Sequence, residues 1–300
     1  MINFMRRKWL YFLISSLAIV PGVLSLVFFG LNPSIDFTGG ALWEVGLTER
    51  EKSEGLEKVI EKVFQEKELS AEVQVSGENQ FIIRTVPLST EQHGLLVTAL
   101  KDKIGSFEEI RFETLGPRLG RELLRKALAA VALAMLAILA YVAYRFRNFA
   151  FGAVAILAML HDTLVLLGVF SILGYFLGVE VGTLFVTAVL TTLSFSVHDT
   201  IVVFDRIREI RRRTNSDLEG AVNQAVGETL VRSLNNSLTI IFMLVALFAL
   251  GGEALKWFVL ALLVGTISGT YSSTFNAAPL LVVWSNLSDR KGLKGIFRLH

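Results

Sequence analysis

The chain has 300 residues, of which 53% are hydrophobic and 19% are charged, and this composition excludes an ordinary soluble domain. Its 29 Lys and Arg nearly balance its 27 Asp and Glu, which gives no indication of a nucleic-acid partner. The lack of cysteine excludes disulfides, thiol catalysis and thiolate metal sites. Apolar runs of about 20 residues match the length of helix that crosses a bilayer. We therefore expect a polytopic α-helical membrane protein.

Six transmembrane helices are predicted. The first apolar run, Trp9 to Gly30, is longer than the apolar part of a signal peptide and lacks a following Ala-x-Ala site, so residues 1–30 are expected to form an uncleaved N-terminus and first span. The next five spans are expected within a bundle of residues 123–284, at about 127–144, 150–173, 183–204, 235–252 and 257–284.

Positive charges predict the orientation. An even number of spans places both termini on one side, and the short flanks on that side hold all the basic residues of the short flanks and loops except Lys256. They are Arg6, Arg7, Lys8, Arg145, Arg147, Arg206, Arg208, Arg211, Arg212, Arg213, Arg290, Lys291, Lys294 and Arg298. Because positive residues resist translocation, we expect cytoplasmic termini, including a tail at 285–300, in the inner (cytoplasmic) membrane.

Residues 31–122, expected to be periplasmic or extracellular, have a pattern of their own. Strand-like and helix-like segments follow one another at 41–45, 51–64, 71–75, 81–86, 90–104 and 110–114. This βαββαβ order predicts a small ferredoxin-like α+β domain with its helices on one face of the sheet. Its sequence carries no metal-ligand, phosphate-loop or nucleophile pattern, so we interpret it as a contact or lever domain.

Charged residues inside the predicted spans are candidates for function, because each is costly in a membrane unless it is paired or hydrated. Asp162 and Asp199 each lie in a His-Asp-Thr triplet, and Arg232 lies at the start of the fifth span. One helical face of the fourth span carries Thr192, Ser196 and Asp199, and one face of the fifth carries Arg232, Asn235, Asn236 and Thr239. If these faces meet, Arg232 neutralises ionised Asp199.

Two interpretations of this pair remain open. A proton switch is one, because burial raises the pKa of a carboxyl group and a nearby cation lowers it. A static pair that sets helix register is the other. His198 is a candidate proton shuttle or a hydrogen-bonding neighbour, and Asp162 is a second proton-coupling candidate that His161 alone would satisfy.

For two further features we favour a structural interpretation over a functional one. Small residues at Gly265, Gly269, Ser273 and Ala277 predict close helix packing by the sixth span. The segment Asp205–Asp217, with five arginines, is expected to be a loop that anchors at anionic membrane lipid, with binding of a cytoplasmic partner as the alternative. Continuation of the fourth helix through Asp205 and Arg206 is the alternative to a helix end at Phe204, and it would place Asp199 deeper.

With these motifs in hand, the chain resembles the SecD/SecF family of protein-export membrane proteins, in the RND superfamily, over nearly its whole length. The resemblance rests on the runs Ile35–Gly40 (IDFTGG), Asp199–Glu209 (DTIVVFDRIRE), Arg232–Asn235 (RSLN) and Gly269–Ser273 (GTYSS). A single small outer segment, without the large extra head expected of SecD, favours the SecF side of the family. His198 in place of the usual Asn, and Asn236 in place of the usual Thr, are departures.

The resemblance implies a half-transporter that pairs with SecD and uses proton-motive force to promote movement of unfolded preprotein through SecYEG, with a YidC-type insertase as a further partner. It assigns proton transport to Asp199 and Arg232, and it implies no cofactor other than the coupling ion, H+ or Na+. Three alternatives have their own tests: an intramembrane aspartyl protease, a passive assembly scaffold and a small-molecule efflux protein. The protease reading lacks the expected Gly-x-Gly-Asp pattern.

Overall fold

The computed structural model describes residues 3–47, 55–76, 79–214 and 217–290. The chain divides into two compact units, which we describe separately. The bundle unit comprises Met1–Asn32 and Leu128–His300, and the sheet unit comprises Pro33–Ala127.

Six helical segments of the described chain are long and apolar enough to cross a membrane, which confirms the predicted number of spans. The first is the short 3-10 turn η1 (Met5–Arg7) continued by α1 (Lys8–Phe28). The next four are α5 (Pro117–Phe146), α6 (Phe149–Leu177), α7 (Thr183–Thr214) and α8 (Leu218–Leu250). The last is α9 (Glu253–Ser272), a π-helical turn η3 (Ser273–Ala277) and α10 (Ala278–Arg290).

The prediction of a loop from Asp205 is wrong, because α7 continues without a break to Thr214. Ion pairs explain the extension. Arg206 pairs with Glu209 one turn away, and Nη2 of Arg213 lies 2.8 Å from Oε1 of Glu209. Arg206 also pairs with Glu228 of α8. Charge pairs spaced three and four residues apart stabilise a helix where its sequence is no longer apolar.

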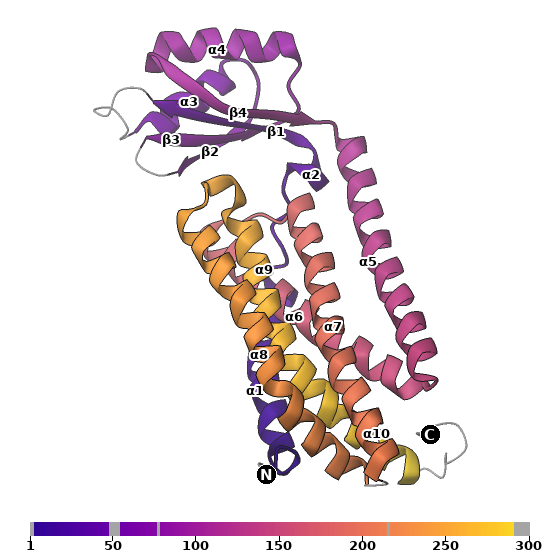
Figure 1. The fold of residues 1–300 in the computed structure, drawn as a ribbon. Helices are drawn as coiled ribbons and strands as arrows, with labels where there is room; N and C mark the ends of the chain where they lie inside the picture. The colour runs from indigo at the N-terminus through magenta and orange to yellow at the C-terminus, as the bar shows by residue number, and fades with distance from the viewer. Residues whose placement is uncertain (1–2, 48–54, 77–78, 215–216, 291–300) are drawn as a thin grey trace. The chain divides into compact units, whose positions relative to one another are not determined.

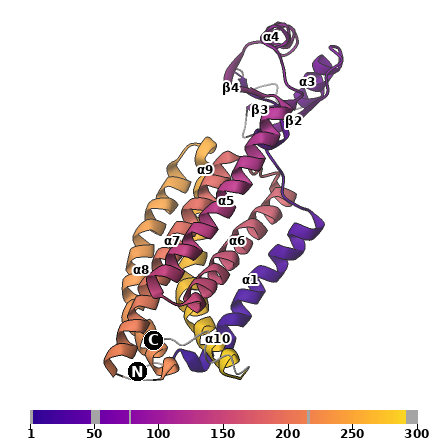
Figure 2. The same ribbon diagram turned by 90° about the vertical axis from the view of Figure 1, so that its right-hand side faces the viewer.

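In the bundle, α7 packs against α6, α8 and α9, and α1 packs along α6 (Figures 1 and 2). The contact of α1 with α6 requires glycine. A Cβ atom on Gly22 would lie 2.9 Å from the Cα atom of Gly168, so the two backbones nearly touch. Beside this contact, the hydroxyls of Ser25 and Ser171 lie 2.8 Å apart.

The sheet unit has the predicted βαββαβ order, preceded by the short helix α2 (Ile35–Thr38). Its elements are β1 (Gly40–Leu47), α3 (Leu56–Gln65), β2 (Ala71–Ser76), β3 (Gln80–Thr85), α4 (Thr90–Ile104) and β4 (Phe107–Leu115). The strand order is β2-β3-β1-β4, and every neighbouring pair is antiparallel. The ferredoxin-like prediction is confirmed; residues 51–54, where the first helix was predicted to start, lie outside the described residues.

One face of β1 supplies the centre of the sheet unit's core. Ala41, Trp43 and Val45 alternate along the strand, and all three are fully buried. The residues that cover them come from both helices and from β3: Ile60, Val63, Phe64, Phe81, Ile83, Leu96 and Leu100. This core is independent of the bundle's core.

Candidate ion-coupling site

Two aspartates lie near the middle of adjacent helices in the bundle. Asp162 of α6 is 3% exposed, and Asp199 of α7 is half-buried. Because α7 runs to Thr214, Asp199 lies deeper in its helix than the predicted end at Phe204 implied. A buried carboxylate needs hydrogen-bond donors or a counter-charge, since an unpaired charge in an apolar interior is costly.

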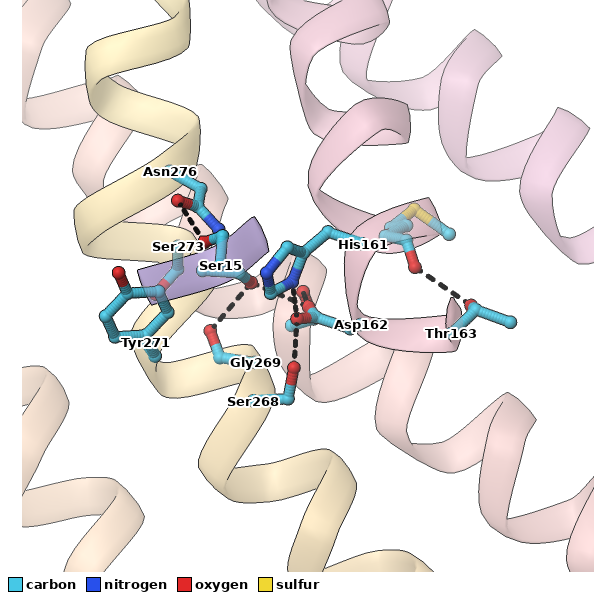
Figure 3. A network of polar contacts seen from close by, with 12 residues as sticks. Ser15, His161, Asp162, Thr163, Ser268, Gly269, Tyr271, Ser273 and Asn276 are labelled. Atoms are coloured by element: carbon cyan, nitrogen blue, oxygen red, sulfur yellow. Dashed lines mark hydrogen bonds and ion pairs between the residues drawn. The ribbon is translucent and has the colours of Figure 1, made fainter. Parts of the chain in front are cut away.

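Asp162 is surrounded by donors from three helices (Figure 3). Its Oδ1 atom accepts a hydrogen bond from Ser268 at 2.6 Å and lies 3.0 Å from Nδ1 of His161. Its Oδ2 atom accepts from Ser196 of α7 at 2.6 Å and from Ser272 at 2.7 Å. The carboxylate therefore connects α6, α7 and α9, and it has three serine partners in addition to His161.

The close packing of α9 on α7 brings these serines within reach. A Cβ atom on Gly265 would lie 2.1 Å from Cγ2 of Thr192, and one on Gly269 would lie 3.2 Å from Cβ of Ser196. Ser273, at the start of η3, is fully buried and donates a hydrogen bond to the carbonyl of Thr270. The glycines thus allow a backbone approach that larger side chains would prevent.

Sequence reasoning missed Ser268 and Ser272 as partners of Asp162. The signal was present, because two serines four residues apart share one face of a helix. Without the rotation of α9 about its axis, however, that face could not be matched to Asp162 in preference to Asp199. Ser233, which follows Arg232, was also missed.

Asp199 has a more open environment than Asp162. Its Oδ2 atom accepts a hydrogen bond from Ser233 of α8 at 2.7 Å. The carboxyl group also lines a cavity of about 210 Å³ between α7 and α8, together with His198, Thr229, Arg232 and other residues. A cavity of this volume has room for several water molecules, each of which occupies about 30 Å³ in the liquid.

The structure brings Arg232 to the same cavity as Asp199 but forms no ion pair between them in the described part of the chain. Arg232, His198 and Asn235 are exposed in the single chain. Asn236 is exposed as well and lines the cavity. Of the two predicted polar faces, Asp199, Arg232 and Asn236 line this cavity, and Ser233 is the direct partner of the carboxylate. Thr192 packs instead against Gly265 of α9.

A smaller cavity of about 20 Å³ lies beside Asp199, between residues of α7, α8 and α9. Ser196, Asp199, Asn236, Ser237 and Thr270 are among its lining residues. Its volume is enough for one water molecule, for which roughly 10–15 Å³ is needed. Ser196 therefore contacts Asp162 with its hydroxyl and also lines a space that Asp199 lines.

Two family models match this chain. The model described as "Protein export membrane protein SecD/SecF, C-terminal" matches residues 96–287, and the "SecD/SecF GG Motif" model matches residues 24–47. The chain belongs to the SecD/SecF family. Among curated relatives, the protein translocase subunit SecF of Thermobaculum terrenum is 43% identical over 95% of both chains.

Longer family members contain a region similar to this chain. The protein translocase subunit SecDF of Bacillus subtilis is 35% identical over 96% of this chain and 39% of its own length. The crystal structure of SecDF from Thermus thermophilus superposes with a TM-score of 0.82 at 33% identity, over 95% of this chain and 39% of that one. The chain therefore spans well under half of these SecDF proteins.

The GG motif of the family corresponds to Gly39 and Gly40, between α2 and β1. Both have positive φ, at 74° and 139°. A Cβ atom on Gly39 would lie 2.7 Å from Cα of Pro117, and one on Gly40 would lie 2.9 Å from the carbonyl oxygen of Thr85. Glycine at both positions therefore permits the positive φ, and it permits the contact of Gly39 with the start of α5 and the close approach of Gly40 to β3.

Proposed function

We propose that this chain is the SecF subunit of a SecDF complex and that it uses a proton-motive force to promote preprotein translocation through SecYEG. The observation that carries the proposal is Asp199, a half-buried carboxylate in the middle of α7 that faces a cavity shared with Arg232. A carboxylate in such a place can bind a proton from water and release it when a cation approaches.

Each residue at the cavity has a proposed role. Asp199 binds the coupling proton, and Ser233 orients the carboxylate through the 2.7 Å hydrogen bond. Arg232 stands without an ion pair to Asp199, so a small shift of α8 against α7 would bring it to the carboxylate and favour proton release. His198, on the same cavity, passes protons between water and Asp199.

The proposed partners are those of a SecDF complex. Because the chain spans 39% of the SecDF proteins it matches, we propose that SecD supplies the complementary half, including a further intramembrane aspartate. SecYEG, an unfolded preprotein and a YidC-type insertase complete the assembly in the inner membrane, with both termini in the cytoplasm. The competing function is a passive scaffold for the same partners.

Late-stage translocation of a preprotein into inverted vesicles tests the proposal. The vesicles contain SecYEG, SecD and this chain, and the rate is measured with and without a proton gradient. We expect Asp199→Asn to remove the stimulation by the gradient. The matched control is Asp205→Asn, which changes an exposed aspartate of the same helix that does not line the cavity. This variant should retain the stimulation by the gradient. Full stimulation in Asp199→Asn would favour the scaffold.

A further inference from the structure

Unfilled hydrogen-bonding capacity lies beside Asp162 in the interior of the bundle. The side chain of His161 is 11% exposed, and its Nε2 atom is buried without a hydrogen-bond partner among the described residues. The same is true of the amide nitrogen of Asn276 and the hydroxyl of Thr274, both in η3. In Figure 3 the His161 ring points from α6 toward α1 and the helix that carries Asn276.

The contacts of Asp162 determine where protons sit in this network. Both carboxyl oxygens receive serine hydroxyls, at 2.6 Å and 2.7 Å on Oδ2 and at 2.6 Å on Oδ1. The remaining neighbour is Nδ1 of His161, 3.0 Å from Oδ1. An ionised carboxylate accepts all four contacts, with the imidazole proton on Nδ1. The Nε2 atom then carries a lone pair and is free to accept a proton.

No described Lys or Arg forms an ion pair with Asp162, so its charge has no other neutralising partner in the structure. The titratable side chains that face His161 are Asp162 on α6 and Tyr271 on α9, whose ring centroid lies 6.4 Å from that of the imidazole. From α1, Tyr11 offers its carbonyl to the Tyr271 hydroxyl at 2.8 Å. The residues of η3 contain no titratable side chain.

We propose that Asp162 and His161 form a second proton-binding site, in which Nε2 of His161 takes the proton and Asp162 remains its permanent counter-charge. Uptake of one proton from water converts the imidazole to imidazolium and changes the net charge of the pair from −1 to 0. Ser196 connects this site to the space beside Asp199, because it donates to Asp162 and lines the 20 Å³ cavity.

This second proton-binding site deepens the proposed function, and only its role in coupling rests on that function. Whether the site binds a proton is tested on the chain alone. The chain is purified at full length in lipid nanodiscs with 15N-labelled histidine rings, and NMR spectra are recorded between about pH 5 and pH 8, where histidine titrates. With only four histidines, His161→Asn identifies the signals of His161. His93→Asn, in the sheet unit, is the matched control.

We expect His161 to show a protonated Nδ1 and an unprotonated Nε2 at high pH, and two protonated nitrogens at low pH. In Asp162→Asn the signal of the doubly protonated ring is lost over the same range. Because Asn places an amide where Nδ1 stands, His161→Asn keeps the hydrogen bond to Asp162 and should leave the other histidine signals unchanged. A neutral ring protonated on Nε2, or a ring that never takes a second proton, overturns the proposal.

Discussion

At the scale of single residues, the two His-Asp-Thr triplets show that one sequence pattern serves two environments. Asp162 is fully buried and accepts three serine hydroxyls, whereas Asp199 accepts one and faces a cavity. The difference arises from the partner helices, since α9 covers Asp162 and the cavity beside α8 opens at Asp199. The triplet alone therefore identifies two candidates and cannot assign their roles.

Removal of the Asp162 carboxylate should destabilise the bundle. In Asp162→Ala the hydroxyls of Ser196 and Ser268 lose their acceptor, and Ser272 keeps only a longer contact, 3.3 Å to the carbonyl of Gly269. Each buried unsatisfied group costs about 1–3 kcal/mol. We expect the free energy of unfolding to fall by about 3 kcal/mol or more. Denaturant unfolding in detergent micelles measures it.

The control for that experiment is Asp205→Ala, which removes only an exposed ion pair with Arg145. Its effect should stay below about 1 kcal/mol. Equal stability of the two variants would show that the Asp162 network contributes nothing to the fold.

A second prediction concerns Gly39 of the GG motif. Gly39→Ala puts a Cβ atom 2.7 Å from Cα of Pro117 at a positive φ and should destabilise the sheet unit by about 1–3 kcal/mol. Gly94→Ala is the counterpart, because Gly94 lies inside α4 with nothing within 4 Å of the added atom. It should stabilise the unit by about 0.5–1 kcal/mol.

Hydrogen exchange of residues 33–127 in the full-length chain measures both effects. Faster exchange in Gly39→Ala and slower exchange in Gly94→Ala are expected. The same rate in Gly39→Ala as in the unaltered chain would mean that the backbone at this position relaxes without strain.

At the scale of elements, the contact between α7 and α9 controls whether the Asp162 network forms. Gly265→Ala places a methyl group 2.1 Å from Cγ2 of Thr192, and overpacking of this kind costs about 1–3 kcal/mol. The reciprocal change Thr192→Gly removes every Thr192 atom that this methyl group would meet. The double variant should therefore recover part of the lost stability, measured as a double-mutant cycle. Strict additivity of the two changes would contradict the packing described for α7 and α9.

Elements also show what the sequence can predict. Hydropathy and length identified all six spans, and alternation identified the four strands, because burial in lipid or in a core demands those patterns. Continuation of α7 through Asp205 and Arg206 was one of two alternatives, but its end at Thr214 was not predicted, because ion pairs at Arg206 and Arg213 continue the helix after apolar residues stop. The serine partners of Asp162 were missed because helix rotation depends on tertiary packing at Gly265 and Gly269.

At the scale of the whole molecule, the basic flanks predict that the bundle crosses the membrane with both termini inside. The chain contains no cysteine, so an introduced cysteine is the only thiol of the chain that a maleimide can label. We expect Thr214→Cys, exposed at the end of α7, to react with an impermeant maleimide only after the membrane is opened. Glu91→Cys, exposed on α4, should react in intact spheroplasts. The reverse labelling pattern would mean that the topology is inverted and that the sheet unit lies in the cytoplasm.

We propose that Asp199 carries the coupling proton, and a measurement of ion flux tests this proposal. The chain is reconstituted with SecD in liposomes, and proton entry driven by a membrane potential is recorded in sodium-free buffer. We expect proton entry with the unaltered chain and its loss with Asp199→Asn, while Asp205→Asn conducts normally. Undiminished proton entry in Asp199→Asn, or an ion flux that appears only when sodium is added, would contradict it.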